Sequence, residues 1–122
     1  MPTVKGKEKI TEAEFQRQVL ELAKLHKWRS AHFRPGMTAK GRWVTAVQGD
    51  GKGFPDTLLI RGRELVVAEL KVGKNKVTPE QAQWLTAFAE ADIPAFVWTP
   101  EDWPEIVIVL SNGPLAFRME GG

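Results

Sequence analysis

Apolar residues at helical spacing predict a helix close to the start of the chain. They recur every three or four positions: Phe15, Val19, Leu22 and Ala23. One face of such a helix is apolar. Thr11 and Glu14 ahead of it match a capping box, in which each side chain binds the backbone N–H of the other residue. We therefore expect a helix over residues 12–27, preceded by a polar, basic N-terminal tail, residues 1–10.

Two further helix starts have a similar form. Thr78 precedes Pro79 and Gln81, which places proline at the first helical position and glutamine at the third. Apolar residues then continue at helical spacing: Ala82, Leu85, Phe88 and Ala89. These features predict a second helix over residues 79–91. Residues 99–102 repeat the cap pattern and predict a short third helix that ends near Leu110.

Short apolar runs between turn residues predict strands. They lie near residues 30–34, 43–47, 57–60, 64–71 and 95–98. Only Arg61, Gly62 and Arg63 separate two of these runs, so we expect those two to form an antiparallel hairpin at the centre of a sheet. The residues between the first two runs are predicted to form a loop.

The order of the predicted elements is helix, strands, helix, strand, helix. This order favours an α/β sandwich in which a central mixed β-sheet is flanked by helices. With 122 residues in all, we expect one domain over residues 11–122. Trp84, Trp98 and Trp103 fall at packing positions and are assigned to the core.

Composition excludes several classes of site. Apolar residues make up 43% and charged residues 26% of the chain, as in ordinary globular proteins. The chain has no cysteine and only two histidines, which excludes disulfide scaffolds, thiol nucleophiles and multi-histidine metal sites. No apolar run approaches the ~20 residues of a membrane span, and the N-terminus lacks the apolar stretch of a signal peptide. We expect a cytoplasmic protein with no membrane partner.

The two parts of the chain differ in charge. Residues 1–53 carry eleven basic and five acidic residues, a net +6, whereas residues 54–122 carry six basic and ten acidic residues, a net −4. The stretch 22–49 contains basic residues but no carboxylate. Such a segment attracts nucleic acid through phosphate contacts. The alternative is a solvated basic face whose counter-charges lie on another element.

Three charged residues continue apolar strand faces. Because side chains alternate along a strand, Glu69 and Lys71 share a face with Leu65 and Val67. Asp56 stands at the start of the preceding strand, which the hairpin brings beside the end of the next one. Two carboxylates and one lysine should therefore meet at the edge of the core.

Two adjacent buried carboxylates repel each other unless a cation lies between them. Mg²⁺ commonly binds to one or two protein carboxylates and fills its remaining positions with water and phosphate oxygens. A lysine beside it can stabilise charge that develops on a phosphate. The alternative is an ordinary cross-strand ion pair between Lys71 and Asp56 or Glu69.

Four segments, in this order, carry a resemblance to a nuclease family. They are residues 53–56, 68–71, 78–85 and 97–103. Pro-Asp at 55–56 followed by Glu-Leu-Lys at 69–71 resembles the PD-(D/E)XK nuclease signature. Together the four segments resemble the VRR-NUC domain, in the small stand-alone form of phages and prophages, over about residues 11–110. The Val-Arg-Arg tripeptide of the family name is absent.

The resemblance implies a restriction-endonuclease-like fold and a metal-dependent DNA endonuclease that hydrolyses phosphodiester bonds. By the same resemblance, Asp56 and Glu69 bind Mg²⁺ or Mn²⁺ together with the main-chain carbonyl of Leu70, and Lys71 is the catalytic lysine. The expected substrate is branched DNA such as a Holliday junction. The expected active form is a homodimer in a bacterial host cell.

Two capping residues also match positions of the family site. Glu14 matches an acidic residue that the family places near the metal, and Gln81 matches a glutamine that reaches the catalytic centre. Each also has a sufficient structural explanation as part of a capping box. Both roles can coexist only where the side chain turns inward.

Several basic residues are candidate DNA contacts: Arg29, His32, Arg34, Lys40, Arg42, Lys74 and Lys76. Which of them replaces the missing family arginines stays open. Two other functions also stay open. One is a DNA-binding module on the same fold without catalysis, and the other is a small interaction protein whose ion pairs are purely structural.

Overall fold

The protein is a mixed α/β structure. The computed structural model describes residues 10–33, 36–37, 43–44 and 51–114. Its elements in chain order are α1 (Glu12–Leu25), β1 (Arg29–His32), β2 (Gly36–Met37), β3 (Trp43–Val44), β4 (Thr57–Arg61), β5 (Glu64–Leu70), α2 (Pro79–Glu90), β6 (Ala95–Trp98), a 3₁₀ turn η2 (Pro100–Asp102) and α3 (Trp103–Asn112). Within the ranges described, no helix is both long and apolar enough to traverse a bilayer.

The main sheet has four strands in the order β1-β4-β5-β6. The hairpin of β4 and β5 lies at its centre, as the sequence predicts. β1 pairs with β4 in antiparallel register, and β6 pairs with β5 in parallel register. The sheet is therefore mixed, and its two edge strands run beside a hairpin that is paired on both sides.

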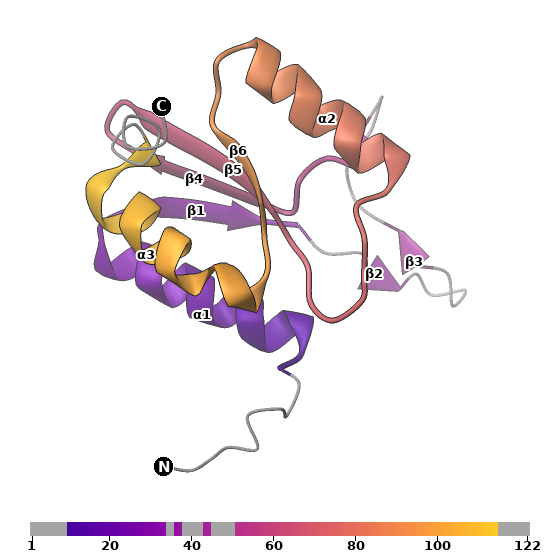
Figure 1. Cartoon of the computed structure of the whole chain (residues 1–122), viewed down its shortest axis with the longest axis horizontal. Helices are drawn as coiled ribbons and strands as arrows, with labels where there is room; N and C mark the ends of the chain where they lie inside the picture. The colour runs from indigo at the N-terminus through magenta and orange to yellow at the C-terminus, as the bar shows by residue number, and fades with distance from the viewer. Residues whose placement is uncertain (1–9, 34–35, 38–42, 45–50, 115–122) are drawn as a thin grey trace.

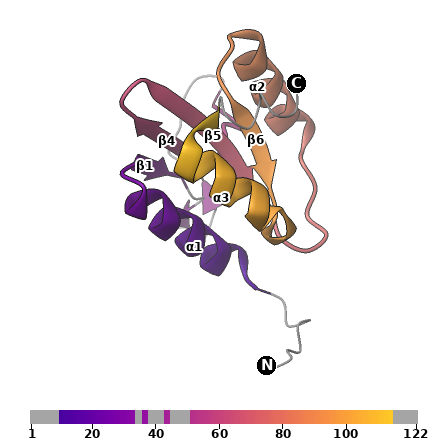
Figure 2. The same ribbon diagram turned by 60° about the vertical axis from the view of Figure 1, so that its left-hand side comes forward.

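One face of the sheet carries the core. Cross-strand partners point to the same side, so Leu59 and Val66 share this face with the pair Ala68 and Phe96. Figure 1 shows α1 and α3 together on one side of the strands, and Figure 2 shows α3 crossing β5 with α1 beside it. The buried helix residues of this layer are Phe15, Val19, Ala23, Ile106, Val109 and Leu110.

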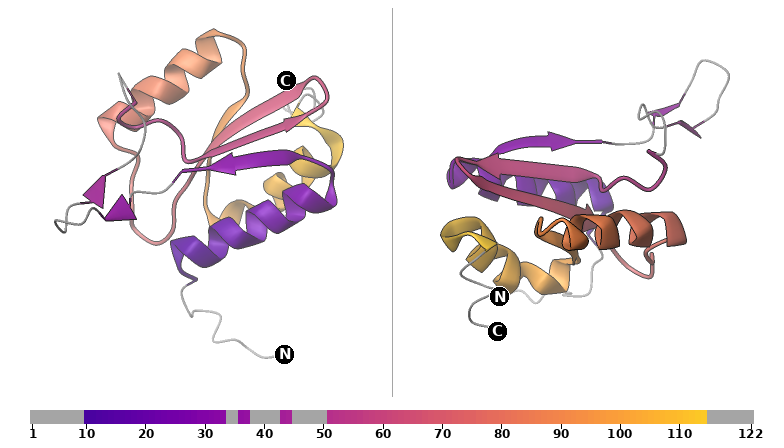
Figure 3. Two further views of the ribbon diagram at one scale, coloured as in Figure 1. Left: turned by 180° about the vertical axis from the view of Figure 1, so that it is seen from behind. Right: turned by 90° about the horizontal axis from the view of Figure 1, so that it is seen from above.

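The other face of the sheet carries Leu58, Val67 and Glu69. Helix α2 stands on this side of the strands in Figure 1 and contacts β6. In the left panel of Figure 3, α2 and α1 lie on opposite sides of β1 and the hairpin. On this second face, α2 covers the part of the sheet near β6.

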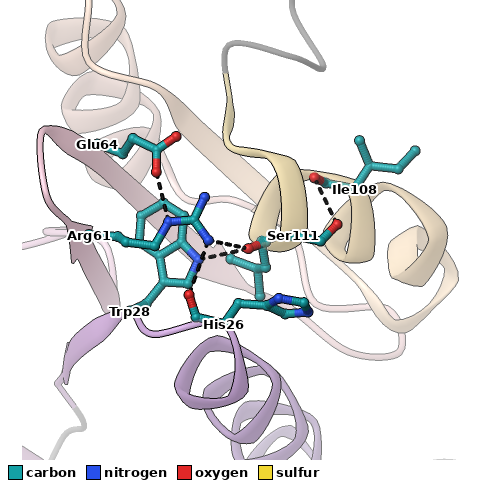
Figure 4. Close-up of polar contacts among 7 residues, drawn as sticks. His26, Trp28, Arg61, Glu64, Ile108 and Ser111 are labelled. Carbon is teal, nitrogen blue, oxygen red and sulfur yellow. Dashed lines mark hydrogen bonds and ion pairs between the residues drawn. The ribbon is translucent and has the colours of Figure 1, made fainter.

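The turn end of the hairpin is anchored to two helices by one arginine (Figure 4). Arg61 Nε donates to Glu64 Oε1 at 2.8 Å, and Arg61 Nη1 donates to the carbonyls of His26 and Leu110 at 3.0 and 3.1 Å. Its guanidinium lies 4.5 Å from the ring centroid of Trp28, whose Nε1 also donates to Leu110. A cation at the carboxyl ends of two helices is favourable because the helix dipoles are negative there.

The element boundaries depart from the sequence prediction in a few places. α1 ends at Leu25 rather than at 27, because His26 caps the helix and Lys27 takes a left-handed φ of 73° that turns the chain into β1. The expected third helix is divided into η2 and α3. Ile10, predicted to belong to the tail, packs against the core.

The expected strand 43–47 is not part of the main sheet. Its first two residues form β3, which pairs with β2 in a separate two-stranded sheet. β2 lies in a segment that the sequence analysis assigned to a loop. Residues 45–47, like the tail 1–9, lie outside the described residues.

Candidate active site

The open end of the hairpin brings Asp56, Glu69 and Lys71 together. Thr57 pairs with Ala68, so Asp56 precedes β4 at the point where β5 reaches Glu69. The backbone N–H of Leu70 donates to Asp56 Oδ2 at 3.3 Å, and Lys71 Nζ lies 3.5 Å from Glu69 Oε2. The juxtaposition expected from strand alternation is therefore present.

The loop that leads into Asp56 is fixed against α2. Gly53 has a φ of 85°, and a Cβ there would lie 2.6 Å from the backbone carbon of Glu80. Only glycine allows so close an approach in this conformation. Trp84 Nε1 donates to the carbonyl of Lys52 at 3.1 Å, and Pro55 is fully buried. The first turn of α2 is thereby held close to the carboxylates.

Gln81 uses both ends of its amide. Its Oε1 accepts from the N–H of Thr78 at 2.8 Å and closes the capping box of α2. Its Nε2 donates to Glu69 Oε2 at 2.9 Å. The capping role and the approach to the site therefore coexist in one side chain. A glutamate at this position would instead place a third carboxylate beside Glu69.

Burial makes both carboxyls difficult to ionise. Burial raises the pKa of Asp56 to about 6, although hydrogen bonds from Thr57 and Leu70 act in the opposite direction. Burial and the charge of Asp56 raise the pKa of Glu69 to about 7, and the ammonium group of Lys71 only partly offsets them. Each carboxylate thus destabilises the ionised form of its neighbour, and one lysine is insufficient to neutralise both.

One oxygen of the site has no partner in the described part of the chain. Glu69 is only 4% exposed, and no described residue forms a hydrogen bond with its buried Oε1. A buried carboxylate oxygen without a partner is costly. A divalent cation bound to this oxygen and to Asp56 would satisfy it and remove the repulsion between the two carboxylates. Oxygen donors of this kind fit Mg²⁺ and Mn²⁺.

The two acidic residues of the first turn of α1 have different surroundings. Glu14 is exposed, and its Oε1 accepts from the N–H of Thr11 at 3.1 Å in the capping box. Glu12 is the α1 carboxylate whose charge raises the pKa of Asp56. Among the described residues, no three His, Cys, Asp or Glu side chains are close enough to hold a metal together. The protein donors near the orphan oxygen are thus Asp56 and Glu69.

Sequence reasoning missed two neighbours of Asp56. The hydroxyl of Thr57 donates to Asp56 Oδ1 at 2.8 Å, and Glu12 acts on Asp56 through its charge. The position of Thr57 directly after Asp56 in the sequence is the signal that could have predicted the hydrogen bond between them. No sequence signal separates Glu12 from Glu14, because both lie in the same helical turn.

The candidate DNA contacts do not all lie at this end of the sheet. His32 pairs with Thr57 at the open end of the hairpin, whereas Arg29 pairs with Ile60 near the turn end. Lys74 and Lys76 are exposed on the loop after β5. Arg29 and His32 are exposed on β1, but their positions differ in parity, so their side chains leave opposite faces. His32 lines a groove of about 540 Å³ between α1 and β1, with Arg17 and Lys24 on its helix wall. Arg34, Lys40 and Arg42 lie outside the described residues.

Comparison of the chain with protein-family models, with curated proteins and with solved structures gives no match. The assignment of the site therefore depends on its geometry and on the order of motifs in the sequence.

Proposed function

We propose that the protein is a metal-dependent DNA endonuclease of the PD-(D/E)XK type, with its active site at the open end of the β4–β5 hairpin. The observation that carries the proposal is the buried Oε1 of Glu69, which has no partner among the described residues, beside a second, partly buried carboxylate, Asp56. A structural ion pair needs one carboxylate for one lysine. Here two carboxylates face Lys71, and one of their oxygens has no partner among the described residues.

In this proposal, Asp56 and Glu69 hold Mg²⁺ or Mn²⁺, with the carbonyl of Leu70 as the expected third protein ligand. The bound cation supplies positive charge that stabilises a phosphate during hydrolysis. Lys71 is directed to the site by its contact with Glu69, where its ammonium group can share charge on a phosphate oxygen. Gln81 holds Glu69 in place through its amide.

DNA as the substrate is supported by charge. Lys74 and Lys76 are exposed on the loop that follows Lys71, and Arg29 and His32 are exposed on β1. Contacts of this kind bind the phosphate backbone and do not depend on base sequence. Selectivity for branched DNA and a homodimeric form are parts of the same proposal, on the strength of the resemblance to VRR-NUC domains.

The test is cleavage of a labelled panel of a four-way junction, a flap, a single strand and a plain duplex. Each is incubated with Mg²⁺, with Mn²⁺ and with EDTA, beside Lys71→Ala as the inactive control and Arg63→Ala, in the exposed turn of the hairpin, as the surface control. We expect metal-dependent cuts that are lost in Lys71→Ala and retained in Arg63→Ala. A wild-type protein that binds DNA but cuts no substrate would instead be the DNA-binding module.

A further inference from the structure

Four aromatic rings form a cluster beside the candidate active site. Phe54 is at its centre, in edge-to-face contact with Phe33, Trp84 and Phe88 at centroid distances of 5.7, 4.9 and 5.8 Å. The rings come from three segments: the residue after β1, the loop before β4 and helix α2. We call these four residues the aromatic cluster.

The aromatic cluster is only partly buried. All four residues keep part of their surface exposed, and α2 contributes two of them without a single fully buried residue. Trp98, on the opposite face of the sheet, is by contrast completely buried. The sequence analysis assigned Trp84 and Trp98 alike to the core, and that assignment is correct only for Trp98. Aromatic surface therefore remains accessible on the face of the sheet that carries Glu69.

The aromatic cluster is tied directly to the carboxylates. The N–H of Phe33 donates to the carbonyl of Asp56 at 2.8 Å, and Phe54 precedes Asp56 by two residues. Helix α2, which carries Trp84, also presents Gln81 to Glu69. A chain bound at the carboxylates therefore continues past these rings.

Exposed cations border the same region. Lys52 is close to Phe54 along the loop, and its side chain is 83% exposed although its Nζ lies 3.8 Å from Glu80 Oε2. Lys74 and Lys76 are exposed beyond Lys71. A partner that satisfies both the lysines and the rings has regularly spaced negative charges and flat aromatic groups. A nucleic acid strand with unstacked bases has both, whereas a paired duplex hides the faces of its bases.

We propose that the aromatic cluster stacks an unpaired nucleobase next to the phosphate that is cut. The inference rests on the proposed nuclease function and specifies its substrate class: DNA whose nucleotides beside the cut are unpaired or easily unstacked. Phe33 is the ring best suited to the contact, because among the rings of the described residues it contacts that of Phe54 alone and lies at the margin of the cluster.

The test removes the base from the DNA and the ring from the protein separately and together. The cut is first mapped on the best substrate with Mn²⁺. A stable abasic residue is then placed, one position at a time, at each of about four nucleotides on either side of the cut, the reach of one strand across a small site. The proteins are the wild type, Phe33→Leu, Phe33→Tyr and Phe96→Leu. Phe96→Leu removes a ring from the opposite face and serves as the matched control.

We expect one or two positions at which loss of the base lowers kcat/KM on the order of ten-fold in the wild type, in Phe33→Tyr and in Phe96→Leu. In Phe33→Leu the same abasic residue should change kcat/KM less than about two-fold, because the stacking partner is already absent. The wild-type scan is informative even where Phe33→Leu does not fold. If no abasic position affects the wild type, the stacking inference is wrong while the nuclease proposal stands. If no intact substrate is cut, both are wrong.

Discussion

The two ends of the β4–β5 hairpin both carry charged residues, but the charges are satisfied differently. At the turn end, one guanidinium is shared by the carboxylate of Glu64 and two helix carbonyls. At the open end, the buried carboxyl of Glu69 and the partly buried carboxyl of Asp56 face one lysine, and one oxygen of Glu69 has no partner among the described residues. The charges at the turn end are thus satisfied within the chain, whereas in the proposed function a bound cation satisfies those at the open end. On that proposal, charge at the first end serves stability, and charge at the second serves binding and catalysis.

The largest effect is expected from Glu69→Gln at the open end. The change keeps the shape of the side chain but removes a ligand charge, so cleavage should fall roughly a thousand-fold. Rates on the mapped DNA substrate with Mn²⁺ measure the effect. Glu64→Gln is the matched control at the turn end and should keep cleavage within about three-fold of the wild type, as expected of a residue remote from the chemistry. Equal losses in the two variants would contradict the division between the two ends.

The next effect is a loss of stability from Arg61→Ala at the turn end. The change removes the Arg61 donor from the carbonyl of His26 and one of the two donors from the carbonyl of Leu110, which keeps the bond from Trp28 Nε1. It also removes the cation from the Trp28 ring. We expect the free energy of unfolding to fall by about 2–3 kcal/mol, as for hydrogen bonds from a charged donor. Urea denaturation measures it. Cleavage per folded molecule should stay near wild type, and a selective loss of activity instead would link Arg61 to the site.

Asp56→Asn should stabilise the metal-free protein at high pH. The folded carboxyl has a pKa of about 6, above its ordinary value of 3.8, so its ionisation costs folding free energy as pH rises from about 4 through 6. Below pH 4 the carboxyl is largely protonated, so its ionisation should cause no difference between the free energies of unfolding of the wild type and the variant. At pH 8 the variant should gain about 1–2 kcal/mol, after allowance for solvent screening at a partly exposed group. Thermal melts in EDTA at pH 4 and pH 8 measure the difference, and a variant less stable at pH 8 would contradict the account.

Gln81→Glu should shift the pH dependence of metal binding. The variant can still accept the N–H of Thr78, but it places a negative charge beside Glu69 Oε2 and raises the pKa of Glu69 above about 7. Because protons compete with the metal, affinity for Mn²⁺ should reach half of its maximum at a higher pH than in the wild type, by about one unit. Titrations across pH 5.5–9 provide the measurement. An unshifted profile would show that Gln81 serves the helix cap alone.

The smallest effect distinguishes the two glutamates of α1. Glu14→Gln retains a capping acceptor, so stability should change by less than about 0.5 kcal/mol and Mn²⁺ affinity by less than about two-fold. Glu12→Gln removes the charge that acts on Asp56 and should alter the affinity by a larger factor. Calorimetric titration with Mn²⁺ measures both affinities. A larger change in Glu14→Gln than in Glu12→Gln would assign the α1 carboxylate of the site to Glu14, as the family resemblance implies.

Local rules predict much of this molecule. The period of two along strands and the short turn expected at residues 61–63 are sufficient to bring Asp56 beside Glu69 and Lys71, since both rules concern neighbouring residues. In the structure this turn consists of Gly62 and Arg63, because Arg61 already pairs with Glu64. Capping boxes at Thr11 and Thr78 place the starts of α1 and α2 correctly. These features need no knowledge of how distant elements pack.

Features that depend on docking could not be predicted in the same way. The second hydrogen bond of Gln81 exists because Gly53 lets α2 approach the loop closely. The half-exposure of Trp84 depends on how much of the sheet face α2 covers. The bonds from Arg61 to two helix ends join residues that are far apart in sequence. Periodicity within one segment carries no information on any of these contacts.

The measurement that tests the central claim most directly is calorimetric titration of Mn²⁺ at pH 8 into the wild type, Glu69→Gln and Glu64→Gln. We expect saturable binding to the wild type and to Glu64→Gln, and no binding to Glu69→Gln, because the open end of the hairpin carries the carboxylate oxygen that has no partner among the described residues. Wild-type protein that binds no Mn²⁺, or binding that survives unchanged in Glu69→Gln, would contradict the assignment of this end as a metal-dependent active site.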